Sequence, residues 1–205
     1  MRTSSPGRPC RSTVASICTR RDRCYAPNDN PSRPVSREYP DRPIAGVGVV
    51  VLRDDQVLMI QRGREPRIGQ WSIPGGKQRL GESWRETAAR EVREETGVEI
   101  EVLGIVDVVD AIIRDGDPPR PGTKAPANDD GPGNVTPLHD RVRYHYTLVD
   151  CAALWTAGEP VAGGDAAHAE WWSLDRLDEL SLWTETIRII TEAAELAVAS
   201  RREPI

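Results

Sequence analysis

The sequence contains no phenylalanine, only two methionines and no long apolar run. Its longest uninterrupted apolar stretch is residues 44–52, which includes two glycines. A membrane-spanning helix needs about 20 apolar residues, so a transmembrane protein is excluded. No apolar segment follows the basic N-terminal residues, as it would in a secretory signal. We therefore expect a cytoplasmic protein that does not bind a membrane.

Charge is divided unevenly along the 205 residues. The whole chain carries −5, from 27 basic and 32 acidic side chains, whereas residues 1–43 contain nine arginines and four acids and carry +5. The other 162 residues therefore carry −10. Residues 1–43 show no apolar periodicity, and such a segment cannot bury enough surface to offset the entropy of ordering. We predict a disordered basic leader there.

Three explanations of this leader stay open. Either the start is placed too early, with Val35 as an alternative initiation codon, or the tail is a real disordered segment, or it is an arginine-rich transit peptide. The first is preferred, and the intact mass of the native protein tests it. Nucleic-acid binding is not expected, because Tyr25 and Tyr39 are the only aromatic residues of the leader.

The four cysteines offer no metal site. Cys10, Cys18 and Cys24 have spacings that match no zinc pattern, and Cys151 lies in a predicted strand. We interpret Cys151 as a small buried apolar side chain and the other three as incidental thiols.

Residues 44–200 alternate between strand-like and helix-like patterns. Short apolar or alternating segments bounded by turn residues are typical of strands, and longer segments without Gly or Pro are typical of helices. This order predicts one α/β domain. The predicted strands are residues 44–52, 57–60, 71–73, 98–109, 141–148 and 170–174, and the predicted helices are residues 82–96 and 184–200.

Local signals mark where these segments begin and end. Ser83 with Glu86 predicts a capping box at the start of the first helix, and Gly97 predicts its end. Pro74-Gly75-Gly76 is expected to stop the third strand. Residues 114–137 contain six prolines and four glycines without an apolar period, so we predict a long loop or a disordered insertion.

The first predicted helix ends in a cluster of glutamates. Glu91, Glu94 and Glu95 fall within an arc of about 100° on a helix of 3.6 residues per turn. Like charges at this spacing oppose helix formation, and the helix dipole disfavours anions in the last turn. A compensating cation is therefore expected, with a plain charged helix face as the alternative. Carboxylate oxygens suit Mg²⁺ or Mn²⁺ better than zinc.

The residues around this cluster carry a longer pattern. Nine positions within residues 76–98 stand at fixed spacing, namely Gly76, Glu82, Arg90-Glu91-Val92, Glu94-Glu95 and Gly97-Val98. This pattern resembles the 23-residue signature of the Nudix hydrolase superfamily at every fixed position. A wider similarity, to the ADP-ribose pyrophosphatase-like branch of that superfamily, extends from about residue 44 to residue 195.

The resemblance implies a fold, an activity and a set of site residues. The fold would be an α/β/α sandwich with a mixed β-sheet. The activity would be Mg²⁺-dependent hydrolysis of a diphosphate linkage in a nucleoside diphosphate derivative. Arg90 would orient Glu91, and Glu82 would support the preceding loop. The implied metal ligands are Glu91, Glu95, Glu94 as an assisting group, the carbonyl of Gly75, and Glu82 if it holds a further ion.

Residues outside the signature supply further candidates. We interpret Asp165 as the general base or an extra metal ligand, with an ordinary loop aspartate as the alternative. His168 is a weaker candidate for the same role. Arg62 and Arg64 would contact substrate phosphates bidentately, unless they are solvated loop charges. Trp71 would stack on a nucleobase, unless it only packs.

The branch of the superfamily also implies a substrate. Its members cleave ADP-ribose to AMP and ribose 5-phosphate, and they often carry a proline near the position of Arg114, whereas the nearest proline here is Pro118. Two alternatives stay open, a nucleoside triphosphate pyrophosphohydrolase and a non-catalytic nucleotide-sensing regulator. The expected partner is a small-molecule nucleotide, and family members are often homodimers.

Overall fold

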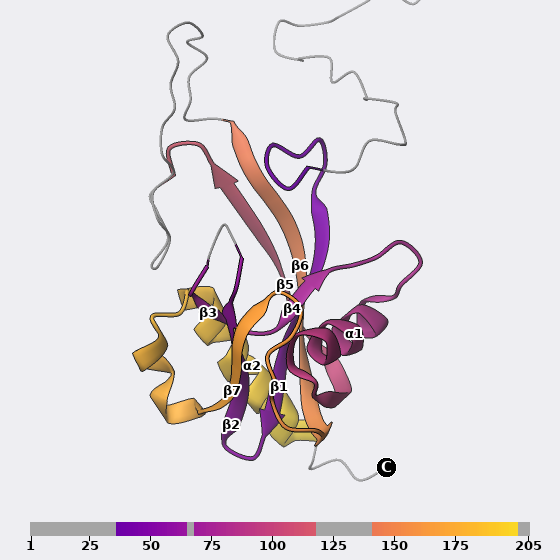
Figure 1. The fold of residues 1–205 in the computed structure, drawn as a ribbon, viewed down its shortest axis with the longest axis vertical. Helices are drawn as coiled ribbons and strands as arrows, with labels where there is room; N and C mark the ends of the chain where they lie inside the picture. The colour runs from indigo at the N-terminus through magenta and orange to yellow at the C-terminus, as the bar shows by residue number, and fades with distance from the viewer. Residues whose placement is uncertain (1–35, 65–67, 118–140, 201–205) are drawn as a thin grey trace, which may run out of the picture. The chain divides into compact units, whose positions relative to one another are not determined.

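The computed structural model describes residues 36–64, 68–117 and 141–200. Residues 1–35 of the predicted leader and residues 118–137 of the predicted insertion lie outside the described residues. Figure 1 shows the elements in chain order. They are β1 (Ile44–Arg53), β2 (Gln56–Arg62), β3 (Trp71–Ser72), β4 (Gly75–Lys77), α1 (Trp84–Thr96), β5 (Glu99–Arg114), β6 (Val142–Ala157), β7 (Ala166–Ser173), the 3₁₀ helix η2 (Leu174–Leu180) and α2 (Thr184–Ser200).

The strands of the described part form one mixed sheet. Its main path is β3-β2-β1-β6-β5, with β4 paired to β1 and β7 paired to β2. β1 and β6 run parallel, and all other pairs are antiparallel. β1 has strand neighbours on both edges and helices over both faces, so it is apolar along nearly its whole length.

The two faces of the sheet have separate cores. Side chains alternate along β1, so Val49 and Val51 point to the face that α1 covers, here called the α1 face. Val50 and Leu52 point to the opposite face, the α2 face, which α2 and η2 cover. Figure 1 shows α1 and α2 on different sides of the sheet. The predicted α/β/α sandwich with a mixed sheet is therefore confirmed.

The helices form where amphipathic patterns meet these faces. Ala88 and Val92 of α1 are fully buried against the valines of β1. Ile189, Ile190 and Ala193 of α2 are buried against the other side of the sheet. The bounds of α2 are those that the sequence predicts. No helix of the described residues is long and apolar enough to cross a membrane.

Several strands are longer than predicted, among them β2, β7 and above all β5 and β6. β5 continues to Arg114 and β6 to Ala157, and together they extend as a hairpin beyond the rest of the sheet (Figure 1). Their pairing contains several register shifts, for example between Val102 and Gly104. β6 lies between β1 and β5, and its residues 150–153 are buried in succession, so the period-two signal of its first half ends inside the strand.

The third strand ends before Pro74-Gly75-Gly76, as predicted, because β3 stops at Ser72, but the two glycines belong to a further strand that the sequence analysis missed. Residues Gly75–Lys77 form β4, which pairs antiparallel with β1. A Cβ at position 75 would lie 2.2 Å from the carbonyl oxygen of Val47. Glycine at position 75 allows the backbones of β4 and β1 to approach closely; it does not interrupt the strand. The 3₁₀ helix η2 was also not predicted.

The residues just before β1 contact the far strands of the sheet. The backbone N–H of Tyr39 donates to the carbonyl of Arg143 at 2.8 Å, and its hydroxyl donates to Asp115 at 3.1 Å. Glu38 accepts hydrogen bonds from Arg143 at 2.9 Å and from the Tyr144 hydroxyl at 2.5 Å. Residues 36–43, which the sequence assigns to the leader, thus include contacts with the folded domain.

Candidate active site

Helix α1 ends at the predicted residue, Thr96, and begins at Trp84, directly after the predicted cap Ser83 and two residues later than predicted. The Ser83 hydroxyl accepts the N–H of Glu86 at 3.3 Å, and the Glu86 carboxylate accepts the N–H of Ser83 at 2.7 Å, which completes a capping box. Gly97 is left-handed with φ 70°, and its N–H donates to the carbonyl of Arg93 at 3.0 Å. These caps fix the start and the end of the helix that carries the glutamates.

Arg90 joins the glutamates of the loop to those of the helix. Its Nε and Nη2 donate to the two oxygens of Glu82 at 2.6 and 2.8 Å, and its Nη1 donates to Glu91 at 2.7 Å. Nη2 also reaches the carbonyl of Lys77 in β4 at 3.1 Å. A guanidinium bound bidentately fixes direction as well as distance. These contacts favour the orienting role that the resemblance implies for Arg90.

Glu82 is committed to contacts within the protein. Besides Arg90, it accepts hydrogen bonds from the N–H of Arg79 at 3.1 Å and from the Thr87 hydroxyl at 3.0 Å. The hydrogen bond from Arg90 is the main reason why the pKa of Glu82 falls to about 2. The contacts favour a supporting role for Glu82 over that of a further metal ligand.

Glu95 is the buried member of the cluster. The residue is 6% exposed, and its Oε2 accepts one hydrogen bond, from the N–H of Gly75 at 2.9 Å. Burial raises its pKa to about 7, and the charges of Glu91 and Asp165 add to the rise, whereas the Gly75 bond and the Arg62 charge oppose it. An ionised Glu95 is thus disfavoured here unless a cation joins the acids.

Gly76 leaves room for the carboxylate of Glu91. A Cβ at position 76 would lie 2.4 Å from Oε1 and 2.7 Å from Oε2 of that residue. These separations are shorter than van der Waals contact, so a side chain at position 76 would displace the carboxylate. Steric exclusion of a side chain therefore explains why the first position of the signature is a glycine.

The loop before β7 closes the C-terminal end of α1. The N–H groups of Val161 and Gly163 donate to the carbonyls of Thr96 and Glu95, both at 2.9 Å. These bonds satisfy carbonyl groups that the helix leaves without a partner at its end. They also bring Asp165, two residues further along, beside the glutamates.

Asp165 pairs with a residue that the sequence assigns to substrate. Its Oδ1 lies 2.9 Å from Nη1 of Arg64, and its backbone carbonyl accepts the N–H of Gly63 at 2.8 Å. The sequence did not predict this contact between a proposed base and a proposed phosphate ligand. Both side chains are partly exposed, so the ion pair is weak and can exchange with a substrate anion.

Arg79 is a site residue that the sequence analysis missed. Its Nη2 lies 3.1 Å from each carboxylate oxygen of Glu94. Arg90 Nη1 reaches the same carboxylate at 3.3 Å. Arg79 lies in the loop, where no periodicity applies, so nothing in the sequence points to this contact. Glu94 is consequently more tied to arginines than Glu95.

The donors of this cluster fit a hard divalent cation. Within the three described ranges, no group of three or more His, Cys, Asp or Glu side chains is gathered closely enough to hold a metal ion. Mg²⁺ does not need such a cage, because it keeps several waters and is usually held by one or two carboxylates plus substrate phosphates. Glu91 and Glu95 supply two carboxylates whose mutual repulsion a cation relieves. Their oxygen chemistry suits Mg²⁺ or Mn²⁺.

The structure separates the predicted substrate-binding residues. Arg62 ends β2, and its charge acts on Glu95, so it lies near the cluster. Trp71 packs on the α2 face, edge-on against Trp172 and His168 with ring centroids 5.7 Å apart in both pairs. These contacts favour the packing alternative for Trp71.

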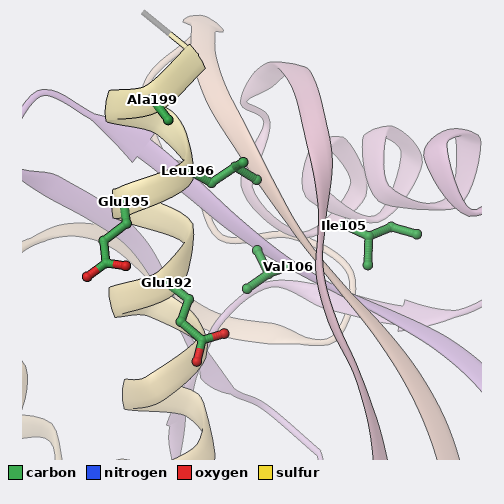
Figure 2. A pocket seen from close by; sticks show the side chains of 6 residues that line it. All are labelled: Ile105, Val106, Glu192, Glu195, Leu196 and Ala199. Atoms are coloured by element: carbon green, nitrogen blue, oxygen red, sulfur yellow. The ribbon is translucent and has the colours of Figure 1, made fainter. Parts of the chain in front are cut away.

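A hollow of about 350 Å³ lies between β5 and α2. Leu196 points from α2 toward the sheet, and Glu195 points away from it (Figure 2). Glu192 is hydrogen-bonded to Arg188 at 2.9 Å. None of the residues predicted for the site lines this hollow, so it is not the candidate active site. The lining residues are Ile105, Val106, Glu192, Glu195, Leu196 and Ala199.

Comparison with known proteins identifies a family to which this chain is similar. A family model described as NUDIX domain matches residues 42–193. The chain is similar to the ADP-ribose pyrophosphatase of Methanocaldococcus jannaschii, 29% identical over 145 residues that cover 71% of this chain and 70% of that protein. It is also similar to the putative ADP-ribose pyrophosphatase YjhB of Bacillus subtilis, 30% identical over 143 residues. That match covers 70% of this chain and 56% of the relative, so the chain spans little more than half of that protein's length.

A solved structure supports the same fold. The NUDIX domain of Shewanella oneidensis NrtR, crystallised with ADP ribose, aligns with a TM-score of 0.53 and 21% identity over 75% of this chain and 88% of that domain. A likeness at this identity shows the fold alone. The family model covers most of the chain, and the signature residues lie on β4, α1, the loop between them and the two residues that follow α1. The chain belongs to the Nudix hydrolase family.

Proposed function

We propose that the chain hydrolyses the diphosphate linkage of ADP-ribose to AMP and ribose 5-phosphate, with Mg²⁺ as the cofactor and Mn²⁺ as an alternative. Similarity to two proteins with the name ADP-ribose pyrophosphatase supports the substrate. The observation that carries the chemistry is the buried carboxylate of Glu95 beside that of Glu91. The two negative charges repel each other, and a cation bound at the end of α1 would relieve this repulsion.

Glu91, Glu95 and the carbonyl of Gly75 would hold the metal ion. Bound there, the ion would neutralise charge on the diphosphate and lower the pKa of a water molecule. The chain itself supplies the positioning. Arg90 fixes the carboxylate of Glu91, and Glu82 in turn fixes Arg90 through two short hydrogen bonds.

The general base would be Asp165 or Glu94. It would take a proton from the attacking water as the water oxygen bonds to phosphorus and the bridging P–O bond breaks. Glu94 contacts Arg79 and Arg90, whereas Asp165 contacts Arg64 through Oδ1. Asp165 pairs with one arginine and Glu94 with two, which favours Asp165. A larger loss of kcat in Asp165→Asn than in Glu94→Gln supports this assignment, and the reverse order assigns the base to Glu94.

A substrate panel tests the proposal against its alternatives. ADP-ribose, NADH, nucleotide sugars and nucleoside triphosphates are incubated with Mg²⁺, with EDTA as the control, and the products are separated by ion-exchange chromatography. Release of AMP from ADP-ribose supports the proposal. Release of pyrophosphate from a triphosphate without cleavage of ADP-ribose favours the triphosphate alternative. Nucleotide binding without turnover of any compound favours the regulator. A cytoplasmic location and a homodimer stay predictions of the sequence.

A further inference from the structure

Two buried hydrogen-bond donors lie where β2 meets the start of β3. They are Nε of Arg62 and Nε2 of Gln70, and neither has an acceptor among the residues that the structure describes. Buried polar groups are nearly always paired, because a buried donor without an acceptor loses its hydrogen bonds to water and gains none. This pair of donors therefore points to a missing acceptor.

A bulge places the two side chains together. The N–H of Arg62 donates to the carbonyl of Gln70 at 2.9 Å, and the N–H of Gly69 donates to the carbonyl of Arg62 at 2.7 Å. Gly69 has φ 81°, so two residues oppose one in the arrangement of a G1 bulge. Directly opposed residues project from the same face of a sheet. Arg62 and Gln70 are thus side-chain neighbours on one face.

That face is the one with the glutamates. Leu58 of β2 packs in the core of the α1 face and Met59 in the core of the α2 face, so alternation puts Arg62 on the α1 face. The charge of Arg62 also acts on Glu95. The next residue, Gly63, donates its N–H to the carbonyl of Asp165 at 2.8 Å. The two donors therefore border the acidic cluster.

We propose that Nε–H of Arg62 and Nε2–H of Gln70 bind a non-bridging oxygen of a substrate phosphoryl group, which makes Gln70 a substrate-binding residue. Two donors without an acceptor, one of them cationic, match an anionic oxygen. The acids beside them favour a cation. A diphosphate bound together with a divalent cation meets both requirements. The inference rests on the proposed hydrolysis of a diphosphate and names a residue that recognises it.

Binding of inorganic pyrophosphate with Mg²⁺ present tests the subsite, and a phosphate assay checks that the pyrophosphate is not hydrolysed. Gln70→Leu removes the donor, Gln70→Glu replaces it with a repelling acceptor, and Gln56→Leu is the control at the far end of β2. Gln56 accepts a hydrogen bond from Arg53 and lies outside the site. Because the bond is to a charged acceptor, we expect the Kd measured by titration calorimetry to rise about 10-fold or more in both Gln70 variants. Gln56→Leu should bind as wild type.

An unchanged Kd in both Gln70 variants would overturn the proposal, as would an equal loss in Gln56→Leu. Urea unfolding identifies any variant that does not fold. If Gln70→Leu does not fold, the test uses Gln70→Glu, which keeps the shape of the side chain. With a hydrolysed substrate, kcat/KM should fall about 10- to 100-fold in the Gln70 variants. Pyrophosphate binding that depends on Gln70 in a wild-type protein without hydrolase activity would sustain the subsite and refute the proposed function. Hydrolysis of the substrate at an unchanged rate in the Gln70 variants would sustain the proposed function and refute the subsite.

Discussion

Two buried carboxylates lie on opposite faces of the sheet. Glu95 on the α1 face and Asp150 on the α2 face are each 6% exposed, and burial is the main reason why the pKa of each rises to about 7. Asp150 belongs to β6 and lies opposite Gly48 of β1. Burial and a raised pKa therefore do not by themselves distinguish a catalytic acid from a structural one.

The neighbours of the two acids make the difference. The charge of Asp107 adds to the rise at Asp150, and that of Arg188 opposes it. Arg188 lies 2.7 Å from Asp107 and also pairs with Glu185 and Glu192 of α2, so the chain supplies the cation on the α2 face. At the other carboxylate, no described residue forms an ion pair with the buried acid, and further acids converge on it. The charge of Arg62 opposes the rise at Glu95, but the described residues form no ion pair there, so we expect a further cation to come from solution.

The largest expected effect separates the two carboxylates by activity. Glu95→Gln should lower kcat/KM for the best panel substrate about 10³-fold, because it removes a charge that would hold the proposed metal ion. Asp150→Asn, the matched change on the α2 face, should stay within about threefold of wild type, since the two sites are independent. Initial rates over a Mg²⁺ series measure both. Equal losses in the two variants would contradict the distinction.

A pair of glycine substitutions sharpens the same comparison. In Gly76→Ala the new Cβ displaces the carboxylate of Glu91, and a misplaced ligand should lower activity about 100-fold with little change in stability. In Gly48→Ala the Cβ would lie 2.1 Å from Oδ1 of Asp150 and 3.0 Å from Cδ1 of Ile73.

Overpacking around Asp150 should instead lower the free energy of unfolding by about 1–3 kcal/mol while activity is largely kept. Urea denaturation together with steady-state rates distinguishes the two outcomes. A loss of stability in Gly76→Ala that matches the loss in Gly48→Ala would show that Gly76 is needed for folding and not for the position of Glu91.

The smallest expected effect is on the pH dependence of stability. The pKa of Asp150 is about 7 in the folded chain and 3.8 as a reference for the unfolded one, so the folded state binds more protons between these values. The contribution of Asp150 to the free energy of unfolding is therefore largest below pH 4. It decreases as the pH rises and becomes constant above pH 7. Asp150→Asn should remove this slope and gain on the order of 2 kcal/mol at pH 8.

Unfolding in urea with EDTA between pH 4 and pH 8 measures this slope. Glu95→Gln should remove a similar part of it, because the pKa of Glu95 is raised in the same direction. The two variants then agree in stability and differ in activity. A wild-type stability that rises across this window would contradict the assignment for both acids.

Local patterns in the sequence predicted helix α1, which carries the glutamates, well. Ser83, Glu86 and Gly97 gave its bounds, since a cap involves contacts over only a few residues. The arc of Glu91, Glu94 and Glu95 followed from helix geometry alone. Predictions became poorer where pairing is not local, as in the length of β6, whose residues 150–153 are buried in succession between β1 and β5.

The sequence by itself determined the family signature, the helix that carries it and the glutamates on one side of that helix, because these depend on spacing along the chain. Only the tertiary structure decided which glutamate is buried, that Asp165 joins it, and that Trp71 faces the other core. Gly163 bonds to Glu95 across 68 residues, and Arg62 meets Gln70 through a bulge. Such contacts depend on how separate segments pack against one sheet, which spacing along the chain does not specify.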